Sequence, residues 1–331
     1  MPDGTLCCRR ALFKLSIYMR LAIVMPCYNE QEVLPHTLEV MLGQLERLVS
    51  RGLISDDSYI FIVDDGSKDR TWQIVRETHA QDPRVKGATL AHNRGQQPAL
   101  MAGLEAVMDR CDACVTMDAD LQDDPAALEK MIAEYNAGCE IVFGVRSNRD
   151  KDTAFKRGTA GMFYKFQQKM GIDVIPNHAD YRLMSNRALH LLAEYGERSM
   201  YLRGIVPQLG LRTAIVKYAR PERAIGESKY PLSKMIALAI DGVTSFTAKP
   251  MTFIFIIGLL LLLIDIVVAV WVMVSYFTGS VVSGWTSLIL SVWFLGSLIL
   301  MSIGILGEYI GKIYVEVKRR PRFAIMEEIF D

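Results

Sequence analysis

The stretch Ala113-Cys114-Val115-Thr116-Met117-Asp118-Ala119-Asp120 places two carboxylates at the end of a short, largely apolar run. Such a run predicts a buried strand. Residues i and i+2 of a strand share a face, so the carboxylates of Asp118 and Asp120 point the same way. Mg²⁺ or Mn²⁺ is typically held by one or two carboxylates together with phosphate oxygens of a substrate. Because open α/β sheets bind ligands at the carboxyl ends of their strands, this position favours a cation site over an ordinary surface turn.

Apolar runs alternate with helical periodicity on both sides of this stretch. The expected strands cover residues 20–25, 59–63, 85–90, 113–117 and 140–145, and the expected helices cover 31–49, 69–79, 96–108 and 125–136. Strand–helix repetition predicts an α/β fold with a largely parallel sheet and right-handed crossovers. The polar clusters of this region all follow strands, which again indicates a site at the carboxyl edge.

Two long apolar stretches lie near the end of the chain. Phe253–Val274 contains one charge, Asp265, and Trp285–Leu306 contains none. Each is about 22 residues long, enough to cross the hydrocarbon core of a bilayer as a helix. The alternative is a buried helical hairpin in a soluble domain. An aspartate inside a span is costly in lipid, so Asp265 is expected to face protein, most simply at a contact between subunits of a homo-oligomer.

Basic residues flank the pair of apolar stretches. Lys229, Lys234 and Lys249 precede the first, and Lys318, Arg319, Arg320 and Arg322 follow the second. The positive-inside rule therefore puts both flanks in the cytosol and the connector 275–284 outside. We expect a protein of the cell (inner) membrane with two spans, and with the domain before the spans and both termini in the cytosol. The expected units are an extension (1–18), a cytosolic domain (19–230), a juxtamembrane amphipathic helix (231–249), a transmembrane hairpin (250–310) and a cytosolic tail (311–331).

Composition adds few constraints. The 37 basic residues balance the 37 acidic ones, and nothing in the sequence suggests a nucleic-acid partner. All cysteines precede the apolar stretches, on the expected reducing side of the membrane, so disulfides are not expected. Residues 1–18 lack the apolar core and cleavage site of a signal peptide.

Four motifs occur in order: Pro26-Cys-Tyr-Asn-Glu30, Asp64-Asp-Gly-Ser67, Asn93-Arg-Gly95 and Asp118-Ala-Asp-Leu-Gln122. Together they resemble the signature of family 2 glycosyltransferases, and in particular the branch that uses polyprenyl phosphates, such as bactoprenol glucosyltransferases and dolichyl-phosphate mannose synthases. Gly226–Tyr230 and the two apolar stretches also fit that branch. The resemblance implies a Rossmann-like nucleotide-sugar-binding domain of the GT-A type, followed by interfacial helices and two transmembrane helices. The chain lacks the Gln-x-x-Arg-Trp motif of processive synthases, which argues for transfer of a single sugar.

The resemblance also implies roles for the motif residues. The nucleotide sugar would be held by Pro26, Tyr28, Glu30, Asp65, Asn93, Arg94 and Gly95. In this set Tyr28 offers a flat face for stacking, and Asp65 would accept a hydrogen bond from the base. The metal, Mg²⁺ or Mn²⁺, would be coordinated by Asp118, Asp120 and Gln122. For the turn Asp64–Ser67, a turn or a helix N-cap is the structural alternative.

The acceptor phosphate is expected at a set of basic and hydroxyl side chains: Arg146, Lys156, Arg157, Ser228 and Lys229. Relatives often carry Ser where this chain has Gly161, so one acceptor contact differs. A contact with lipid headgroups is the alternative role for Lys229. Asp180, in the step Asp180-Tyr-Arg182, is expected among the catalytic residues beside Asp118 and Asp120. A structural Asp–Arg pair is the alternative there.

The expected reaction is inverting transfer of one sugar from a nucleotide sugar to polyprenyl (undecaprenyl) phosphate at the cytosolic membrane face. UDP-glucose is the favoured donor, and mannose, galactose and amino sugars stay open. Residues 155–169 and 233–246 are expected to lie in the membrane interface, or else to pack as ordinary surface helices. The rival functions are a catalytically silent membrane adaptor and a transferase that acts on a lipid without phosphate.

Overall fold

The structure, a computed structural model, describes residues 18–147, 178–197, 202–219 and 284–330, with isolated positions between 254 and 270. Its strands are β1 (Leu21–Cys27), β2 (Tyr59–Asp64), β3 (Val85–Leu90), β4 (Ala113–Thr116), β5 (Ile141–Arg146), β6 (His178–Ser185), β7 (Thr213–Tyr218) and β8 (Ile325–Ile329). Its helices are α1 (Leu34–Ser50), α2 (Thr71–Gln81), α3 (Gln96–Val107), the 3₁₀ turn η1 (Met108–Arg110), α4 (Ala127–Asn136), α6 (Asn186–Ala193), α7 (Leu202–Gln208) and α10 (Trp285–Val317). The expected alternation of strands and helices up to residue 146 is confirmed.

All the described strands form one sheet in the order β7-β5-β6-β4-β1-β2-β3-β8. The pairs β4–β1, β1–β2, β2–β3 and β5–β7 are parallel, whereas β4–β6, β5–β6 and β3–β8 are antiparallel. The five predicted strands, β1 to β5, all run in the same direction, as a largely parallel sheet requires, and β7 runs with them. The exceptions are β6, which enters between β4 and β5 in the opposite direction, and β8, which joins the far edge from the end of the chain.

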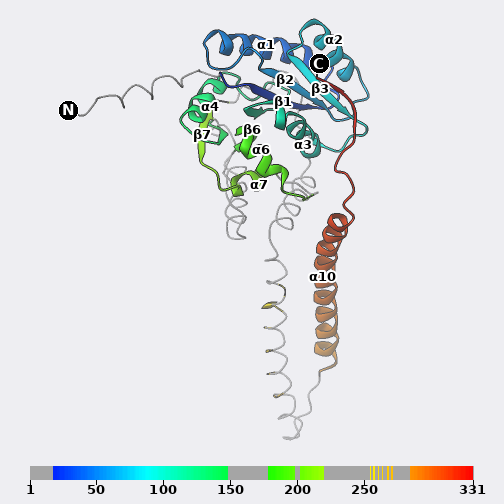
Figure 1. Ribbon diagram of the computed structural model, residues 1–331. Coiled ribbons are helices and arrows are strands. Elements are labelled where there is room, and N and C mark those ends of the chain that lie inside the picture. The colour runs from blue at the N-terminus through cyan, green and yellow to red at the C-terminus, as the bar shows by residue number, and fades with distance from the viewer. Residues whose placement is uncertain are drawn as a thin grey trace, which may run out of the picture.

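Helices cover both faces of this sheet, which makes a three-layer α/β domain (Figure 1). Side chains of a strand alternate between faces, and β1 shows the result. Leu21, Ile23 and Met25 lie in the core shared with α1, α2 and α4. Ala22 and Val24 lie in the core shared with α3, α6 and α7.

Helix α3 packs unusually close to the sheet because of one glycine. A Cβ on Gly103 would lie 2.5 Å from the side chain of Val24 and 2.6 Å from that of Val63. Real Cβ atoms do not approach other atoms so closely, so any larger residue would push α3 outward. The first turn of α3 contributes to the site described below, and Gly103 therefore helps to set its position.

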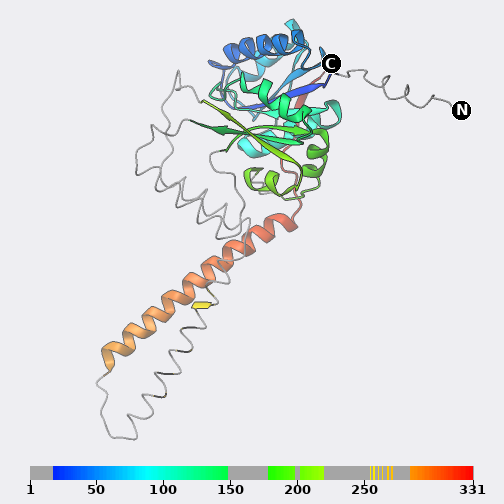
Figure 2. The same ribbon diagram turned by 90° about the vertical axis from the view of Figure 1, so that its left-hand side faces the viewer.

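Helix α10 leaves the domain as a long rod (Figures 1 and 2). Its part Phe294–Val317 is the one helical segment within the described ranges that is long and apolar enough to cross a membrane. It overlaps the second predicted span, Trp285–Leu306, and extends further towards the C-terminus. The first predicted span falls outside the described residues apart from isolated helical positions, so the two-span arrangement and the domain limits stay predictions.

Candidate active site

A cleft of about 400 Å³ opens at the carboxyl ends of β1, β2 and β4. It is lined by residues from all four sequence motifs, including the one that follows β3, and by the start of α3: Pro26, Tyr28, Glu30, Asp65, Asn93, Gly95, Gln96, Asp118 and Asp120 among others. Most of the donor-site residues expected from the sequence thus come together in one place, where α/β sheets of this kind bind ligands. Within the cleft the Tyr28 side chain is 40% exposed, so its ring is available for stacking.

A larger and more open hollow, of about 1020 Å³, lies at the opposite edge of the sheet. Charged side chains there pair with one another, as Arg20 does with Asp57 and Arg187 with Glu140. None of the residues predicted to bind a ligand line it. The cleft at the carboxyl edge is therefore the candidate site, although it is the smaller of the two.

Asp65 holds the loop that closes one side of the cleft. Its carboxylate oxygens accept hydrogen bonds from the backbone N–H groups of Arg94 (2.7 Å) and Gly95 (2.8 Å). Gly95 adopts φ +92°, a conformation that favours glycine, directly before α3 begins. Burial raises the pKa of Asp65, and the two amide hydrogen bonds oppose that rise. Asp65 thus lies where the sequence predicted, but its carboxylate is engaged in shaping the loop 93–95 rather than pointing freely at a base.

The loop after β4 is fixed by three side chains from two other elements, α1 and β6. The Thr37 hydroxyl donates to the carbonyl of Ala119 (2.7 Å), and the Gln44 amide donates to that of Pro125 (3.2 Å). The Tyr181 hydroxyl donates to the carbonyl of Asp124 (3.1 Å). Leu121 is held at φ +54°, a left-handed conformation that costs energy for a residue with a side chain. The loop is therefore held in one conformation with its carboxylates in the cleft, as a preorganised site requires.

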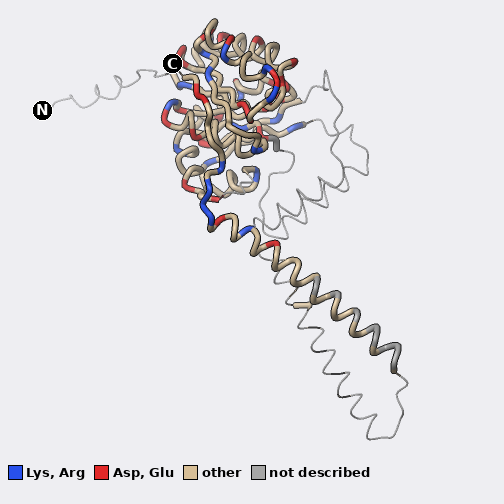
Figure 3. Tube along the Cα trace, turned by 90° about the vertical axis from the view of Figure 1, so that its right-hand side faces the viewer, with Lys and Arg blue, Asp and Glu red and all other residues tan. Residues whose placement is uncertain are grey.

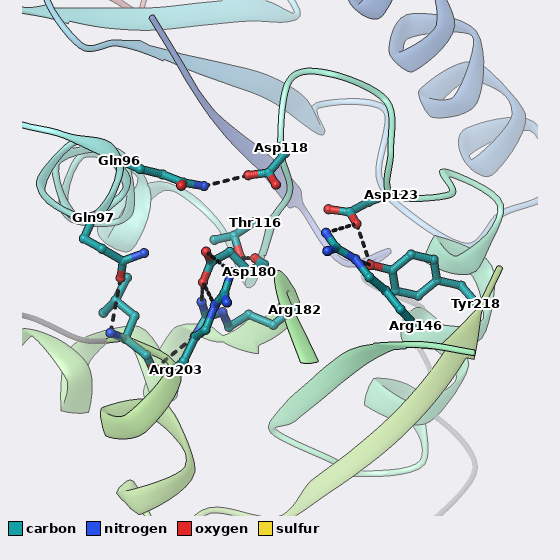
Figure 4. A network of polar contacts seen from close by, with 11 residues as sticks. Gln96, Gln97, Thr116, Asp118, Asp123, Arg146, Asp180, Arg182, Arg203 and Tyr218 are labelled. Atoms are coloured by element: carbon teal, nitrogen blue, oxygen red, sulfur yellow. Dashed lines mark hydrogen bonds and ion pairs between the residues drawn. The ribbon is translucent and has the colours of Figure 1, made fainter. Parts of the chain in front are cut away.

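Among the described residues, Asp118 is the carboxylate whose charge is most disfavoured. Burial, and then the nearby carboxylates of Asp123, Asp180 and Asp120, raise its pKa to about 7. In the structure it accepts a hydrogen bond from the side-chain amide of Gln96 (2.8 Å; Figure 4). A cation bound near Asp118 would offset this negative charge and favour the ionised carboxylate.

The residues expected to bind a metal suit a hard cation. Asp118 and Asp120 are carboxylates, and Gln122 is buried with its Oε1 atom lacking any hydrogen-bond partner. A buried polar atom without a partner is rare and calls for an explanation, and a metal ligand is one. Within the described ranges no group of three or more acidic, histidine or cysteine side chains is arranged to hold a metal. The remaining ligands would therefore have to come from the diphosphate of a donor, as is usual for Mg²⁺.

Removing the charge of Asp118 is expected to stabilise the metal-free protein at neutral pH. Its pKa is raised in the folded state to about 7 from an ordinary value of 3.8, so the folded protein loses stability as the pH rises from about 4 through 7. Asp118→Asn should remove this loss, which amounts to at most about 4 kcal/mol. We expect its melting temperature in EDTA to equal that of the wild type near pH 4 and to exceed it at pH 8. A difference in melting temperature between the two proteins that is the same at pH 4 and at pH 8 would contradict the prediction.

Asp180 lies between two arginines rather than pointing freely into the cleft. Its carboxylate pairs with Arg182, which is fully buried, and with Arg203 at 3.0 Å (Figure 4). The Thr116 hydroxyl, on the neighbouring strand β4, donates to the backbone carbonyl of Asp180. Asp180 is nevertheless close enough to raise the pKa of Asp118. The structural Asp–Arg pair is thus present, and it stands beside the cleft.

Arg146, the one predicted acceptor-phosphate residue within the described ranges, lies on the other side of the Asp118 loop. Its guanidinium contacts the carboxylate of Asp123 (3.2 Å) and the hydroxyl of Tyr218 (3.2 Å), and the Tyr218 hydroxyl donates to the same carboxylate. Asp123 is fully buried, and its Oδ2 atom has no hydrogen-bond partner. Arg146 keeps about a quarter of its side chain exposed. Lys156, Arg157, Ser228 and Lys229 lie outside the described residues.

Sequence reasoning missed Asp123, Tyr218, Arg203 and Gln96 as parts of the site. Asp123 stands next to Gln122 in the quoted loop, so its position was visible although its role was not. Tyr218 and Arg203 contact the site from distant parts of the chain. No local pattern marks them, because only the pairing of β5 with β7 and the packing of α7 on β6 bring them there.

Comparison with known proteins agrees with the motifs. Residues 22–210 match the model of the family "Glycosyl transferase family 2". An uncharacterized glycosyltransferase of Bacillus subtilis, YkoT, is 46% identical over 94% of this chain and 92% of its own length. The SfII prophage-derived bactoprenol glucosyl transferase of Shigella flexneri is 36% identical over 93% of this chain and 97% of its own length. Among solved structures, glucosyl-3-phosphoglycerate synthase from Mycobacterium tuberculosis, in complex with Mn²⁺, UDP and glucosyl-3-phosphoglycerate, is 16% identical with a TM-score of 0.43, covering 68% of this chain and 78% of that one.

Proposed function

This chain belongs to glycosyl transferase family 2 and is related to bactoprenol glucosyl transferases, and from that premise we propose that it transfers one sugar from a nucleotide sugar to polyprenyl phosphate. The cleft at the carboxyl edge carries this proposal, because it gathers a stacking tyrosine, a loop held by Asp65 and a cluster of oxygen ligands. UDP-glucose is the favoured donor and undecaprenyl phosphate the favoured acceptor. The relatives named bactoprenol glucosyl transferase support this choice.

The donor would lie across the cleft. Tyr28 stacks on the base, Pro26 and Glu30 border it, and the loop Asn93–Gly95 lies against the sugar and phosphates. Asp118, Asp120 and Gln122 would hold Mg²⁺ or Mn²⁺. Such a cation, when bound, neutralises negative charge on the diphosphate as it leaves.

The acceptor needs little activation by a base. A phosphate monoester has its second pKa near 6, so its oxygen is largely ionised at neutral pH. That oxygen forms a bond to the anomeric carbon while the bond from this carbon to the nucleoside diphosphate breaks, and in-line attack inverts the configuration. The protein then acts mainly by positioning and charge. Asp180, between Arg182 and Arg203, is suited to orienting hydroxyl groups of the sugar, and Arg146 to holding the acceptor phosphate.

The pairing of β8 with β3 supports a second membrane span. Strand β8 follows α10 and pairs with the sheet of the catalytic domain, so the two lie on the same side of the membrane. If α10 crosses the membrane once, the chain between Tyr218 and Trp285 must cross it once as well. The predicted span 253–274 lies in that interval.

Topology mapping checks this arrangement. Reporters fused at Asp331 and inserted near Asp3 are both expected to report the cytosol, and a reporter inserted near Gly279 the outer side. The reason is the excess of Lys and Arg on the flanks, which Figure 3 shows for the C-terminal junction of α10 with the domain. Opposite locations for the two termini would refute the two-span arrangement.

A donor screen tests the proposed function. Purified protein in vesicles with undecaprenyl phosphate is offered UDP-glucose, UDP-galactose, a UDP-amino sugar and GDP-mannose, and release of the nucleoside diphosphate is measured. We expect UDP-glucose to be used fastest and release to depend on both the lipid and the metal. Preference for another donor would change the assigned sugar but not the proposed reaction. Absence of release with every donor would favour a silent adaptor, and equal rates with a lipid lacking phosphate would favour the other rival.

A further inference from the structure

The chain returns from α10 to the catalytic domain and completes its sheet. Strand β8 pairs antiparallel with β3, with Gly87 opposite Ile329, Ala88 opposite Glu328 and Thr89 opposite Glu327. Figures 1 and 2 show this return from the end of the rod to the sheet edge. The last strand of the catalytic sheet is thus directly connected to the helix that is fit to cross the membrane.

The side chain of Phe330 anchors this strand. Its ring lies 5.3 Å from that of Tyr59 and 5.7 Å from that of Phe61. The Lys86 ammonium and the Arg110 guanidinium lie over the same ring, at 4.4 Å and 3.9 Å from its centroid. Aromatic and cation–π contacts of this kind add stability beyond the burial of apolar area.

Two glutamates on β8 add polar contacts. The indole N–H of Trp72 donates to Glu327 (2.9 Å), and Arg110 pairs with Glu328 (2.7 Å). The strand is therefore attached through β3, α2 and η1 together, and it also covers an edge of the sheet.

The connection between helix and strand is short. Helix α10 ends at Val317, and Arg322 already contacts the domain through Glu105 (3.3 Å) and the carbonyl of Tyr195 (2.6 Å). Only residues 318–321 lie between, a length that spans about 18 Å at most when fully extended. The membrane helix and the sheet are consequently held within a narrow range of distances.

The same segment touches the border of the donor cleft. The backbone N–H of Ala91 donates to the carbonyl of Ala324 (2.9 Å). Ala91 lies two residues before Asn93, where the loop that Asp65 holds begins. A displacement of residues 322–330 would therefore also displace the start of this loop.

We propose that residues 322–330 form a positioning strap that holds the donor cleft at a set height and orientation above the membrane, so that a lipid-borne phosphate can reach the bound sugar. This inference rests on the proposed function, because it assumes an acceptor in the membrane. The strap contacts neither donor nor acceptor, and it acts through the position of the whole sheet. An effective concentration set by the length of a tether is the physical basis.

Lengthening the connection separates positioning from folding. A Gly/Ser segment of about ten residues is inserted between Arg320 and Pro321. It leaves every contact of β8 intact, but it adds a flexible linker with a root-mean-square length of roughly 17 Å between α10 and the domain. We expect the rate with undecaprenyl phosphate in vesicles to fall roughly tenfold. The rate with a short-chain, water-soluble prenyl phosphate and the Kd for UDP should stay unchanged. The matched control carries the same Gly/Ser segment after Asp331.

A second pair of variants loosens the strand itself. Phe330→Ala removes the anchor, whereas Met326→Ala changes a side chain that is 72% exposed on the same strand. Phe330→Ala should reproduce the selective loss with the vesicle-borne acceptor, and Met326→Ala should not. If Phe330→Ala and the insertion both lower the rates with the two acceptors equally, the strand only stabilises the sheet and the positioning role is refuted. Unchanged rates in the insertion variant refute it as well.

Spin labels make the test independent of the acceptor. Labels on Lys68 and Ile313, both exposed, report the distance between the domain and α10 in vesicles. We expect a narrow distribution of distances in the parent protein and a broad one in the insertion variant. A distribution in the parent as broad as in the variant would overturn the strap. A parent protein that uses no prenyl phosphate at all but shows the narrow distribution would refute the proposed function and leave the mechanical coupling supported.

Discussion

Asp118→Asn and Asp120→Asn are each expected to reduce sugar transfer by roughly 10³-fold or more while the protein stays folded. Both carboxylates line the cleft, and Gln122, two residues further along the loop, has a buried Oε1 atom without a hydrogen-bond partner. Asparagine keeps the shape of each side chain but removes the charge that a divalent cation needs. The measurement is the initial rate of transfer at saturating donor and acceptor, with Mg²⁺ or Mn²⁺ in excess.

A carboxylate of the same loop serves as the control. Asp124 accepts a hydrogen bond from the backbone N–H of Ala126 (2.9 Å) and does not line the cleft. Asp124→Asn should therefore keep transfer within a few-fold of the wild type. Gln122→Ala is expected to weaken metal binding, so that a higher metal concentration is needed for the half-maximal rate. Activity of the wild type in EDTA equal to that with metal would disprove the assignment of all three ligands.

Arg146→Ala is expected to weaken the use of polyprenyl phosphate about ten- to a hundredfold without changing the Kd for the donor. The planar fork of an arginine can hold phosphate oxygens bidentately, and hydrogen bonds to charged groups contribute about 1.5–3 kcal/mol each. Arg157→Ala should change the acceptor kinetics in the same direction. The measurement is KM and kcat for the acceptor at saturating donor, with the donor Kd determined separately by calorimetry.

The structure adds a complication at Arg146. This guanidinium also balances the buried carboxylate of Asp123, so alanine leaves that charge without its cation and is expected to lower stability as well. Arg146→Lys keeps a cation next to Asp123 but loses the fork, and it should preserve the melting temperature while restoring acceptor use only in part. Tyr218→Phe removes a donor to the same carboxylate and serves as the control for a purely structural effect. Loss of donor binding with intact acceptor kinetics would place Arg146 in the nucleotide site.

The central part of the fold could be predicted from local pattern because each strand there is a compact apolar run. The runs 59–63 and 85–90 correspond to β2 and β3, and the polar residues after β1, β2 and β4 meet in one cleft. Because parallel strands place their carboxyl ends at one edge of the sheet, the order of strands and motifs in the sequence was enough to predict that the motifs meet there.

The rest depended on contacts between distant parts of the chain. Nothing in residues 178–185 indicates that β6 runs antiparallel between β4 and β5, and nothing in 325–329 indicates that it pairs with β3. Likewise, the sequence predicted Arg146 as a contact of the acceptor phosphate and gave no sign that tertiary packing also pairs it with Asp123 and Tyr218. The roles of Lys156, Arg157, Ser228 and Lys229 stay predictions.

Transfer of a single sugar to a lipid phosphate is tested most directly on the product itself. Purified protein in vesicles is incubated with undecaprenyl phosphate, UDP-glucose and metal, and the extracted lipid is examined by mass spectrometry and by NMR of the anomeric centre. We predict a lipid that carries one hexose on its phosphate, in the anomeric configuration opposite to that of the donor, and no product when metal is withheld. Lipids with several sugars, retention of the donor configuration, or an unmodified lipid after complete release of UDP would contradict it.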